Sequence, residues 1–522
     1  MLHKSYGLLI AATSLRRYSV NKLRLQTGEA CTPNLPRLKL TALIACGLTG
    51  CTMGPDYQKV EPQVANHWQA GQAPETGLKT VTSPAEGSTS PESLKNWWKS
   101  FGDATLDHLM VVALADNLDV KIALARIDQA RAERRGTRAE LFPTVNVATG
   151  AQRQSNPFPG FAPGIKFNLF ELGFDALWEI DLFGRQQRRL EAASADLEGA
   201  GEHYQQSLVI LTAELARSYI EYRNLQNLLK ITHANLDAMH GSLGLTEKLF
   251  KEGVGTRHDV VRARAQGETT EAQIPALEAR QIAALRQLEV LVGQQPGALA
   301  RELSQAAAIP VMPGQAILTS PVETLRNRPD LRIAERRLAA ATAMQGSAIA
   351  ELFPKISLSA FLGLRNTDIE SLFKSAAFSY GTAASLLQPL LNFGRIQAGI
   401  DLTEARQQEA YLAYQKGVLE ALQETETALT RYLKEEIRRQ LLARSVADQQ
   451  ESVRLSQLRY QEGVSSFLDV LDAQRALYVV ESELANSQAA TAINLIALYK
   501  SLGGGANATS PQFNPKPKEK DS

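Results

Sequence analysis

Apolar side chains recur every seven residues along one unusually long stretch in the first half of the chain. One series consists of Leu208, Leu215, Tyr222, Leu229, Leu236 and Leu243, and a second, three positions away, of Leu190, Leu197, Tyr204, Leu211 and Leu225. Two such series form the a and d seam of a coiled coil. The pattern predicts one helix over about 186–250, roughly 98 Å long at 1.5 Å per residue. The stretch 395–460 predicts a second helix of nearly the same length.

Shorter helical patterns flank the two long ones. They predict helices at about 105–140, 257–293, 321–350 and 467–502. Laid end to end, the two short helices of each half have approximately the same length as the long helix between them. The chain should therefore rise by one helix, descend by the long helix and return halfway. Proline is tolerated in the first turn of a helix but disrupts its interior, so we expect Pro329 to begin a helix and Pro275 to kink one.

Alternation of apolar and polar residues predicts four β-strands, near 143–152, 170–182, 354–366 and 379–391. In the second strand, apolar residues from Leu172 to Leu182 alternate with residues that include Glu171, Asp175, Glu179 and Asp181. The same period fits both a half-buried sheet in a soluble protein and a tilted strand that crosses a membrane. We favour the membrane because no other segment of the sequence is available to cover the apolar face.

The membrane interpretation requires more than one copy of the chain. No apolar stretch of the mature chain approaches 18 residues, which excludes a transmembrane helix. Lipid tolerates no open sheet edge, and the smallest barrels have about eight strands. A dimer would supply eight strands and a trimer twelve, and only the trimer would leave a wide lumen. The acidic side chains of the second strand would face that lumen or its rim.

The sequence contains an internal duplication of about 210 residues. Three motifs recur in the same order: Glu140-Leu141-Phe142-Pro143 as Glu351-Leu352-Phe353-Pro354, Phe183-Gly184-Arg185 as Phe393-Gly394-Arg395, and Glu252-Gly253-Val254 as Glu462-Gly463-Val464. Because separated matches share nearly the same offset, one unit has been copied once. Both halves should therefore share one fold, namely a helix, two strands, a very long helix, a tight turn and a helix.

The first 50 residues resemble a secretion signal. Arg37 and Lys39 precede the apolar stretch 40–48, which is too short to span a bilayer but long enough for a signal-peptide core. Leu48-Thr49-Gly50-Cys51 follows and resembles a bacterial lipobox, whose cysteine is lipid-modified and becomes the first residue of the mature protein. We therefore expect lipidation at Cys51. The next residue is Thr52 rather than the aspartate that retains many lipoproteins at the inner membrane, which points to the outer membrane.

These patterns divide the chain into six segments. Residues 1–50 are the leader, 51–104 an extended lipid-anchored segment, 105–293 the first repeat, 294–320 a linker, 321–502 the second repeat and 503–522 a flexible tail. The linker, the extended segment after Cys51 and the C-terminal tail are rich in Pro, Gly or polar residues. Such composition is typical of chain that wraps or trails on the outside of a fold.

Composition excludes several classes of function. Lys and Arg number 56 and Asp and Glu 55, so the chain has no basic surface for nucleic acid. The three cysteines, Cys31, Cys46 and Cys51, lie in the first tenth of the chain, and the seven histidines form no metal-ligand pattern. We expect neither a metal nor a cofactor. The sequence has no nucleophile motif, phosphate loop or histidine–carboxylate constellation, so we do not expect an enzyme.

The lipobox, the duplicated motifs and the sequence YQEGVSSFLDVLDAQ at 460–474 resemble the TolC-like outer-membrane efflux family, in its OprM/NodT-like lipoprotein branch. The resemblance covers nearly all of the mature chain. It implies a mainly α-helical chain with a membrane β-barrel portion, assembled as a homotrimer with a 12-stranded barrel continued by an α-helical barrel in the periplasm. The implied function is the outer-membrane exit duct of a tripartite pump that exports drugs or other toxic small molecules. The implied partners are outer-membrane lipid, a periplasmic adaptor (membrane fusion) protein and an inner-membrane RND-type transporter.

The resemblance also assigns roles to individual residues. Carried onto matching positions, it gives an entrance ring of Asp469 and Asp472, gate residues Asp259 and Tyr460, and adaptor-contact tips at Gly253 and Gly463. Six carboxylates from three copies would favour cations and bind polyvalent metal ions that block the tunnel. Secretion-type members of the family carry an arginine where this chain has Ser465, so a different set of hydrogen bonds should hold the gate.

Three alternatives remain open at this point. The chain could be the outer-membrane duct of a type I protein secretion system, against which the lipobox argues mildly. It could be a lipid-anchored periplasmic coiled-coil adaptor, which would explain the heptads but not the four strands or the duplication. Asp469 and Asp472 could also serve only as helix-capping residues on a solvated face, because acidic residues are favoured in a first helical turn.

Overall fold

The order of helices and strands occurs twice along the chain. The computed structural model describes residues 52–62, 64–70, 94–155, 166–310 and 318–508, all within one compact unit, Gly50–Ser522. The first copy contains α3 (Ala104–Asp116), α4 (Leu118–Ala139), α5 (Arg185–Lys251), α6 (Arg257–Glu271) and α7 (Ile274–Leu291). The second contains α8 (Pro321–Asn327), α9 (Pro329–Ala350), α10 (Arg395–Gln461) and α11 (Phe467–Ser501). The short 3-10 helix η2 (Trp97–Phe101) precedes them, and η3 (Ile369–Ser371) and η4 (Ser375–Ala377) lie in the second hairpin.

The two long helices have 67 residues each, which confirms the heptad prediction. The seam positions Leu208, Leu215 and Tyr222 of α5 are buried, and they join the largest apolar cluster of the described residues. In that cluster the Trp97 ring packs 5.4 Å from the Tyr499 ring of α11. None of the described helices combines the length and the apolar character that crossing a membrane requires.

Three predicted short helices are each divided in two. The predicted 105–140 helix breaks at Asn117, whose side-chain oxygen accepts from the amides of Asp119 and Val120 at 2.9 and 3.1 Å and so caps α4. The predicted 257–293 helix ends at Glu271 and resumes at Ile274, with Pro275 in the first turn of α7. The kink expected at Pro275 is thus a helix break. Pro329 begins α9 as predicted, and α8 precedes it as a separate short helix.

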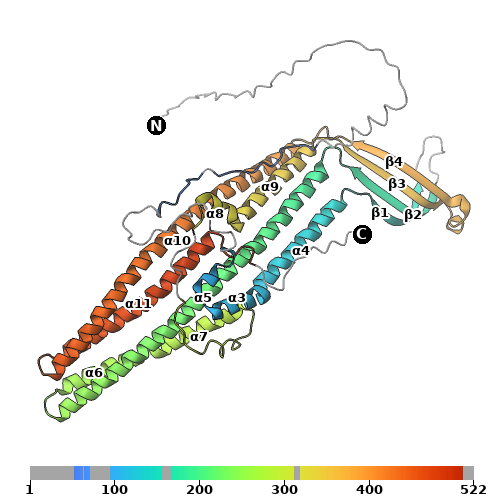
Figure 1. Ribbon diagram of the computed structural model, residues 1–522. Helices are drawn as coiled ribbons and strands as arrows, with labels where there is room; N and C mark the ends of the chain where they lie inside the picture. The colour runs from blue at the N-terminus through green and yellow to red at the C-terminus, as the bar shows by residue number, and fades with distance from the viewer. Residues whose placement is uncertain (1–51, 63, 71–93, 156–165, 311–317, 509–522) are drawn as a thin grey trace, which may run out of the picture. The chain divides into compact units, whose positions relative to one another are not determined.

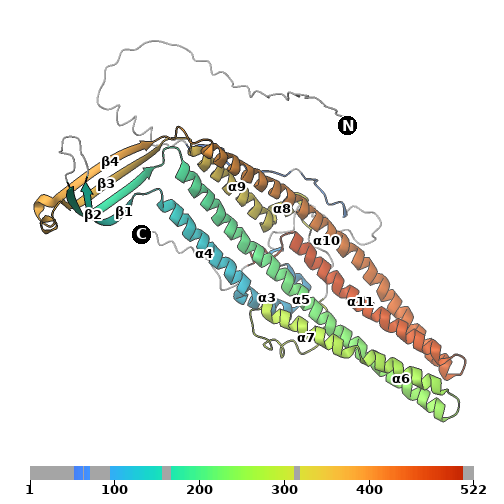
Figure 2. The same ribbon diagram turned by 180° about the vertical axis from the view of Figure 1, so that it is seen from behind.

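The four strands form one antiparallel sheet in the order β1-β2-β3-β4. Their bounds are β1 (Thr144–Ser155), β2 (Lys166–Ile180), β3 (Lys355–Asn366) and β4 (Phe378–Leu387). The prediction of four strands is confirmed, although the fourth ends at Leu387 rather than at 391. The sheet lies at one end of the long helices, and the α5–α6 and α10–α11 turns lie at the other end (Figures 1 and 2).

The linker between the repeats is held against the helices by buried polar groups. The Glu289 carboxylate of α7 accepts from the amides of Gly297 and Leu299 at 2.8 and 3.1 Å, and from Arg286 Nη1 at 2.7 Å. On the neighbouring face of α5, Arg223 Nη1 donates to the Gln305 carbonyl at 2.9 Å. Residues 294–310 are therefore fixed to the helices by specific contacts.

Candidate functional site

The two helix-turn-helix turns at the end away from the sheet have the same backbone. We call residues 252–256 the α5–α6 tip and residues 462–466 the α10–α11 tip. Gly253 and Gly463 have φ values of 77° and 71°, a left-handed conformation that glycine adopts without a side-chain clash. Val254 and Val464, which follow them, are 78% and 65% exposed. Each tip thus presents an apolar side chain to its surroundings.

A capping box begins the helix after each tip. The Thr256 hydroxyl accepts from the Asp259 amide at 3.2 Å, and the Asp259 carboxylate accepts from the Thr256 amide at 3.4 Å. Ser466 and Asp469 form the equivalent box, in which the Ser466 amide donates to the Asp469 carboxylate at 3.2 Å. Both aspartates therefore stabilise a helix start in the single chain, whatever else they do.

Asp469 and Asp472 lie one turn apart at the start of α11, and both are exposed. The position in the first repeat equivalent to Asp472 is Arg262, which lies 210 residues earlier. The paired negative charge therefore occurs only in the second repeat.

The two predicted gate residues lie close enough to influence each other. The Tyr460 ring packs against the Phe467 ring, with centroids 5.5 Å apart, beside buried Met239 of α5. Burial raises the pKa of the Tyr460 hydroxyl, and the negative charge of Asp259 raises it further. Tyr460 is thus a neutral, half-buried group that joins the second repeat to the first.

A ladder of side-chain hydrogen bonds joins α11 to α5 and to the helices after it, and sequence reasoning did not find it. Gln474 Nε2 donates to Ser242 Oγ at 3.0 Å, and Arg475 Nε donates to Gln266 Oε1 at 2.7 Å. One turn further along α11, the Tyr478 hydroxyl donates to Gln273 at 2.6 Å and lies 3.1 Å from the Thr232 hydroxyl. No repeated motif marks these residues, because the contacts run between the two repeats.

The Ser465 hydroxyl makes no hydrogen bond that could hold the gate within the described part of the chain. Its Oγ is buried without a hydrogen-bond partner in the described part of the chain, and its amide donates to the Arg459 carbonyl at 3.3 Å. Near the tips, the two repeats are held together within the chain by the α11 ladder and by the apolar cluster that contains Met239, Ala263 and Phe467.

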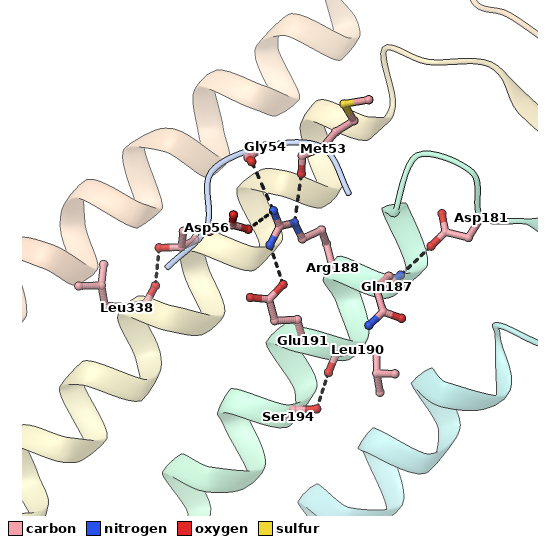
Figure 3. A network of polar contacts seen from close by, with 11 residues as sticks. Met53, Gly54, Asp56, Asp181, Gln187, Arg188, Leu190, Glu191, Ser194 and Leu338 are labelled. Atoms are coloured by element: carbon pink, nitrogen blue, oxygen red, sulfur yellow. Dashed lines mark hydrogen bonds and ion pairs between the residues drawn. The ribbon is translucent and has the colours of Figure 1, made fainter. Parts of the chain in front are cut away.

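At the other end of the helices, a buried arginine holds the segment that follows Cys51 (Figure 3). Arg188 of α5 donates from Nε to the Met53 carbonyl at 3.1 Å, and from Nη2 to the Gly54 carbonyl at 3.3 Å and the Asp56 carboxylate at 2.7 Å. Its Nη1 donates to Glu191 at 2.8 Å. Cys51 itself lies outside the described residues.

The same segment also contacts the residues that come directly after β2. The Met53 amide donates to the Phe183 carbonyl at 3.2 Å. Gly184, at φ 76°, lies against Thr52, and a Cβ atom there would approach the Thr52 Cα to 2.8 Å. The chain is therefore fixed at the junction of helices and strands from its first described residue.

Metal-ligating side chains do not cluster: within the described ranges, no three His, Cys, Asp or Glu side chains come together in a way that could hold an ion. The polar groups of the tips and the junction instead make hydrogen bonds and ion pairs within the protein.

Comparison with known proteins explains this architecture. The sequence model of the family described as outer membrane efflux protein matches residues 109–294 and 320–504, which together make up more than half of the chain. The chain belongs to the outer membrane efflux protein family. The two matched ranges correspond to the two copies of the helix–strand–helix order.

Two relatives match this chain over nearly their full length. The solvent efflux pump outer membrane protein SrpC of Pseudomonas putida is 32% identical over 475 residues, which cover 90% of this chain and 98% of that protein. Nodulation protein T of Rhizobium leguminosarum bv. trifolii is 30% identical over 472 residues, which cover 88% and 96%. The solved structure of the outer-membrane channel OprN superimposes with a TM-score of 0.79 and 34% identity, covering 87% of this chain and 99% of that one.

This membership confirms the family, fold class and function expected from the sequence. The chain is an outer-membrane efflux channel protein of TolC-like fold, with its helical part in the periplasm, and it is not an enzyme. Outer-membrane channels of tripartite pumps work with an adaptor and an inner-membrane transporter.

Proposed function

We propose that three copies of this chain form the exit duct of a tripartite pump that exports small toxic molecules such as solvents, drugs or antibiotics. The open four-stranded sheet is the observation that supports a multimer, because β1 and β4 are its edges among the described strands and lipid tolerates no open edge. The efflux names of relatives, such as the solvent efflux pump protein of Pseudomonas putida, support the substrate class. The partners on the periplasmic side are an adaptor and an RND-type transporter.

Lipidation at Cys51 would attach this duct to the outer membrane in addition to its strands. The contacts of Arg188 with Met53, Gly54 and Asp56 support this assignment, because they fix the residues directly after Cys51 beside the end of β2. An acyl chain attached there would enter the bilayer next to the sheet. Each methylene that it buries contributes about 0.8 kcal/mol to membrane association.

The entrance ring is proposed at Asp469 and Asp472. Three copies would bring six carboxylates together in a narrow aqueous passage, which attracts cations and repels anions. The exposure of both side chains at the start of α11 supports this role. The capping box gives Asp469 a second role, so replacing it by alanine would remove the charge and the helix cap together.

The tips are proposed as the adaptor-contact surface, and Asp259 and Tyr460 as part of the gate. Val254 and Val464 provide apolar contacts at the two tips, on turns whose conformation depends on Gly253 and Gly463. Opening of the entrance would require α11 to move relative to α5 and α6, against the contacts around Tyr460.

Conductance of purified protein in planar bilayers tests this function. Wild-type trimers should form cation-selective pores that divalent or trivalent cations block from the periplasmic side. The double variant Asp469→Asn/Asp472→Asn should lose most of this selectivity and block, because asparagine keeps the capping oxygen while removing the charge. Asp128→Asn on α4 provides a matched control. Unchanged selectivity and block in the double variant would contradict the ring, and protein that forms no pores would contradict the duct.

A further inference from the structure

A pocket of about 240 Å³ lies between α5, α9 and α10. α5 and α10 contribute their first turns to it and α9 its last turns, and these ends of the helices lie beside the strands (Figures 1 and 2). Pockets for drug-sized molecules usually measure about 300–1,000 Å³. The pocket is therefore suited to a small chemical group rather than to a whole drug molecule.

The charged side chains that line this pocket are mainly basic. Three of them are arginines, Arg185 and Arg189 of α5 and Arg395 of α10, and the fourth is Glu351, which follows α9. The Glu351 carboxylate also lies 3.7 Å from Lys355 Nζ, so it is shared with a further cation. Guanidinium groups bind phosphate and carboxylate oxygens through paired N–H donors. The lining is thus suited to an anion.

Arg185 and Arg395 end the two copies of the Phe-Gly-Arg motif, but only the first has a carboxylate partner. Arg185 Nη2 donates to Glu179 Oε1 at 2.8 Å. The offset of 210 residues between the copies places Pro389 at the position of Glu179. Arg395 is exposed and makes no ion pair within the described part of the chain. The second copy of the motif therefore has the cation without the anion.

The equivalence of these positions is fixed on both sides of Pro389. Leu177 and Leu387 occupy matching places in the pairing of the two hairpins. Further along the chain, Phe183 and Phe393 begin the two copies of the motif. Both pairs are separated by the same offset, so no insertion or deletion shifts the position of Pro389.

The starts of the two long helices differ in the same way. In the first turn of α5, the Asp181 carboxylate accepts from the Gln187 amide at 2.7 Å (Figure 3). The counterpart of Asp181 is Leu391, and no described side chain caps the start of α10. The positive end of a helix dipole favours negative charge nearby. The start of α10, next to Arg395, thus lacks two carboxylates that are present at the start of α5.

The other two arginines of the pocket also retain capacity to bind an anion. Arg185 Nε is buried and has no hydrogen-bond partner within the described ranges, which is unfavourable for an N–H group. Arg189 Nη1 lies 3.3 Å from Glu140, and the two side chains are 43% and 50% exposed. An ion pair with that exposure contributes little, so it leaves Arg189 available to a ligand.

We propose that this pocket binds a phosphate group, which neutralises Arg395 as Glu179 neutralises Arg185. A phosphate group has more oxygens than a carboxylate to share among three guanidinium groups. Its source is a phospholipid headgroup, since the neighbouring strands belong to the membrane portion of the channel, or a soluble phosphate compound. The site is separate from the proposed entrance ring, which lies at the opposite end of the long helices (Figure 1).

Binding to the purified protein in phosphate-free detergent solution tests the site. Isothermal titration calorimetry with inorganic phosphate and native mass spectrometry with phosphatidylglycerol measure the two dissociation constants. Diacylglycerol, which lacks the phosphate, is the control lipid and should not bind. Tighter binding of phosphatidylglycerol assigns the pocket to a lipid headgroup, and tighter binding of inorganic phosphate assigns it to a soluble compound. Wild-type protein that binds neither probe would overturn the proposal.

Two variants locate the binding in this pocket. Arg395→Gln should weaken binding of the tighter probe by about tenfold or more, because it removes a charge-assisted hydrogen bond. Pro389→Glu introduces the carboxylate of the first copy and should also weaken binding, although Arg395 stays in place. Arg406→Gln removes an exposed arginine of α10 outside the pocket and is the matched control. Equal binding in Arg395→Gln and Arg406→Gln would overturn the site.

A further outcome would assign Arg395 to a contact between copies. In that case Arg395→Gln would lower the unfolding temperature in phosphate-free detergent and leave the binding of both probes unchanged, which would also overturn the site. Pore formation by the same variants in planar bilayers shows that they fold. It also separates the two hypotheses, since pores formed by protein that binds no phosphate would contradict the site and leave the proposed duct in place.

Discussion

Trp178 and Gln388 occupy equivalent positions in the two repeats and make the same hydrogen bond with different side chains. Trp178 Nε1 donates to the Leu141 carbonyl at 2.9 Å, and Gln388 Nε2 donates to the Leu352 carbonyl at 3.0 Å. In both repeats, this bond ties the end of a hairpin to the turn that follows the preceding helix. The contact recurs although the side chains differ, so the geometry of the junction is common to both halves.

Trp178→Phe keeps an aromatic ring at this junction and removes the donor together with the five-membered ring that carries it. We expect it to destabilise the protein by about 1 kcal/mol, the typical net contribution of one hydrogen bond. Thermal unfolding in detergent, followed by circular dichroism, measures the effect. Gln388→Leu should have a similar effect in the second repeat. Wild-type stability in both variants would show that the carbonyls find other partners.

Arg188 should control the order of the segment after Cys51. The arginine is 3% exposed, and it contacts Met53, Gly54 and Asp56 with a planar fork that lysine lacks. Arg188→Lys should therefore raise amide exchange in residues 53–56 at least tenfold while leaving the long helices unchanged. Arg189→Lys alters the exposed neighbouring arginine and is the matched control. Equal exchange in the two variants would mean that Gly184 and Phe183 hold the segment without the guanidinium.

Most of the fold followed from the sequence because its signals are local and repeated. The heptads predicted α5 and α10, and the alternation predicted four strands. The break at Asn117 did not follow, because it depends on one side chain that caps α4 in place of continuing the helix. The bounds of β4 also differed: the predicted strand continues to residue 391, but among the described residues no strand pairs with the outer edge of β4.

In the candidate site, too, some residues could be predicted from the sequence and others could not. Motifs that recur at a fixed offset, such as Gly253 with Gly463, were visible in the sequence. Contacts between the repeats, such as Gln474 with Ser242, have no counterpart at the same offset and appeared only in three dimensions. The roles of Asp469 and Asp472 depend on the neighbouring copies and stay predictions.

Tyr478 should help to hold the channel entrance closed. Its hydroxyl is shared between Gln273 and Thr232, at 2.6 and 3.1 Å. Tyr478→Phe removes both contacts, and a loss of about 0.5–1.5 kcal/mol would raise the open population roughly two- to tenfold. Single-channel recordings measure that population. Tyr411→Phe, which removes only the local contact of Gln415 on α10, is the control. Equal open populations in the two variants would contradict the role of Tyr478.

The attachment of the linker should weaken in acid because it depends on the Glu289 carboxylate. Burial raises the pKa of Glu289, but hydrogen bonds from Arg286 and from the amides of Gly297 and Leu299 outweigh it and lower the pKa overall. A carboxyl group whose pKa is lower in the folded state stabilises the fold above its unfolded-state pKa of about 4.3, and that contribution is lost as the pH falls through the folded-state pKa. Amide exchange at Gly297 and Leu299, corrected for intrinsic pH dependence, should therefore be slow and constant from pH 7 to 5 and rise below about pH 4. Glu289→Gln keeps an acceptor without the charge, so it should exchange faster at pH 7 and show no further rise in acid. A rise that persists unchanged in Glu289→Gln would assign the acid sensitivity to another group.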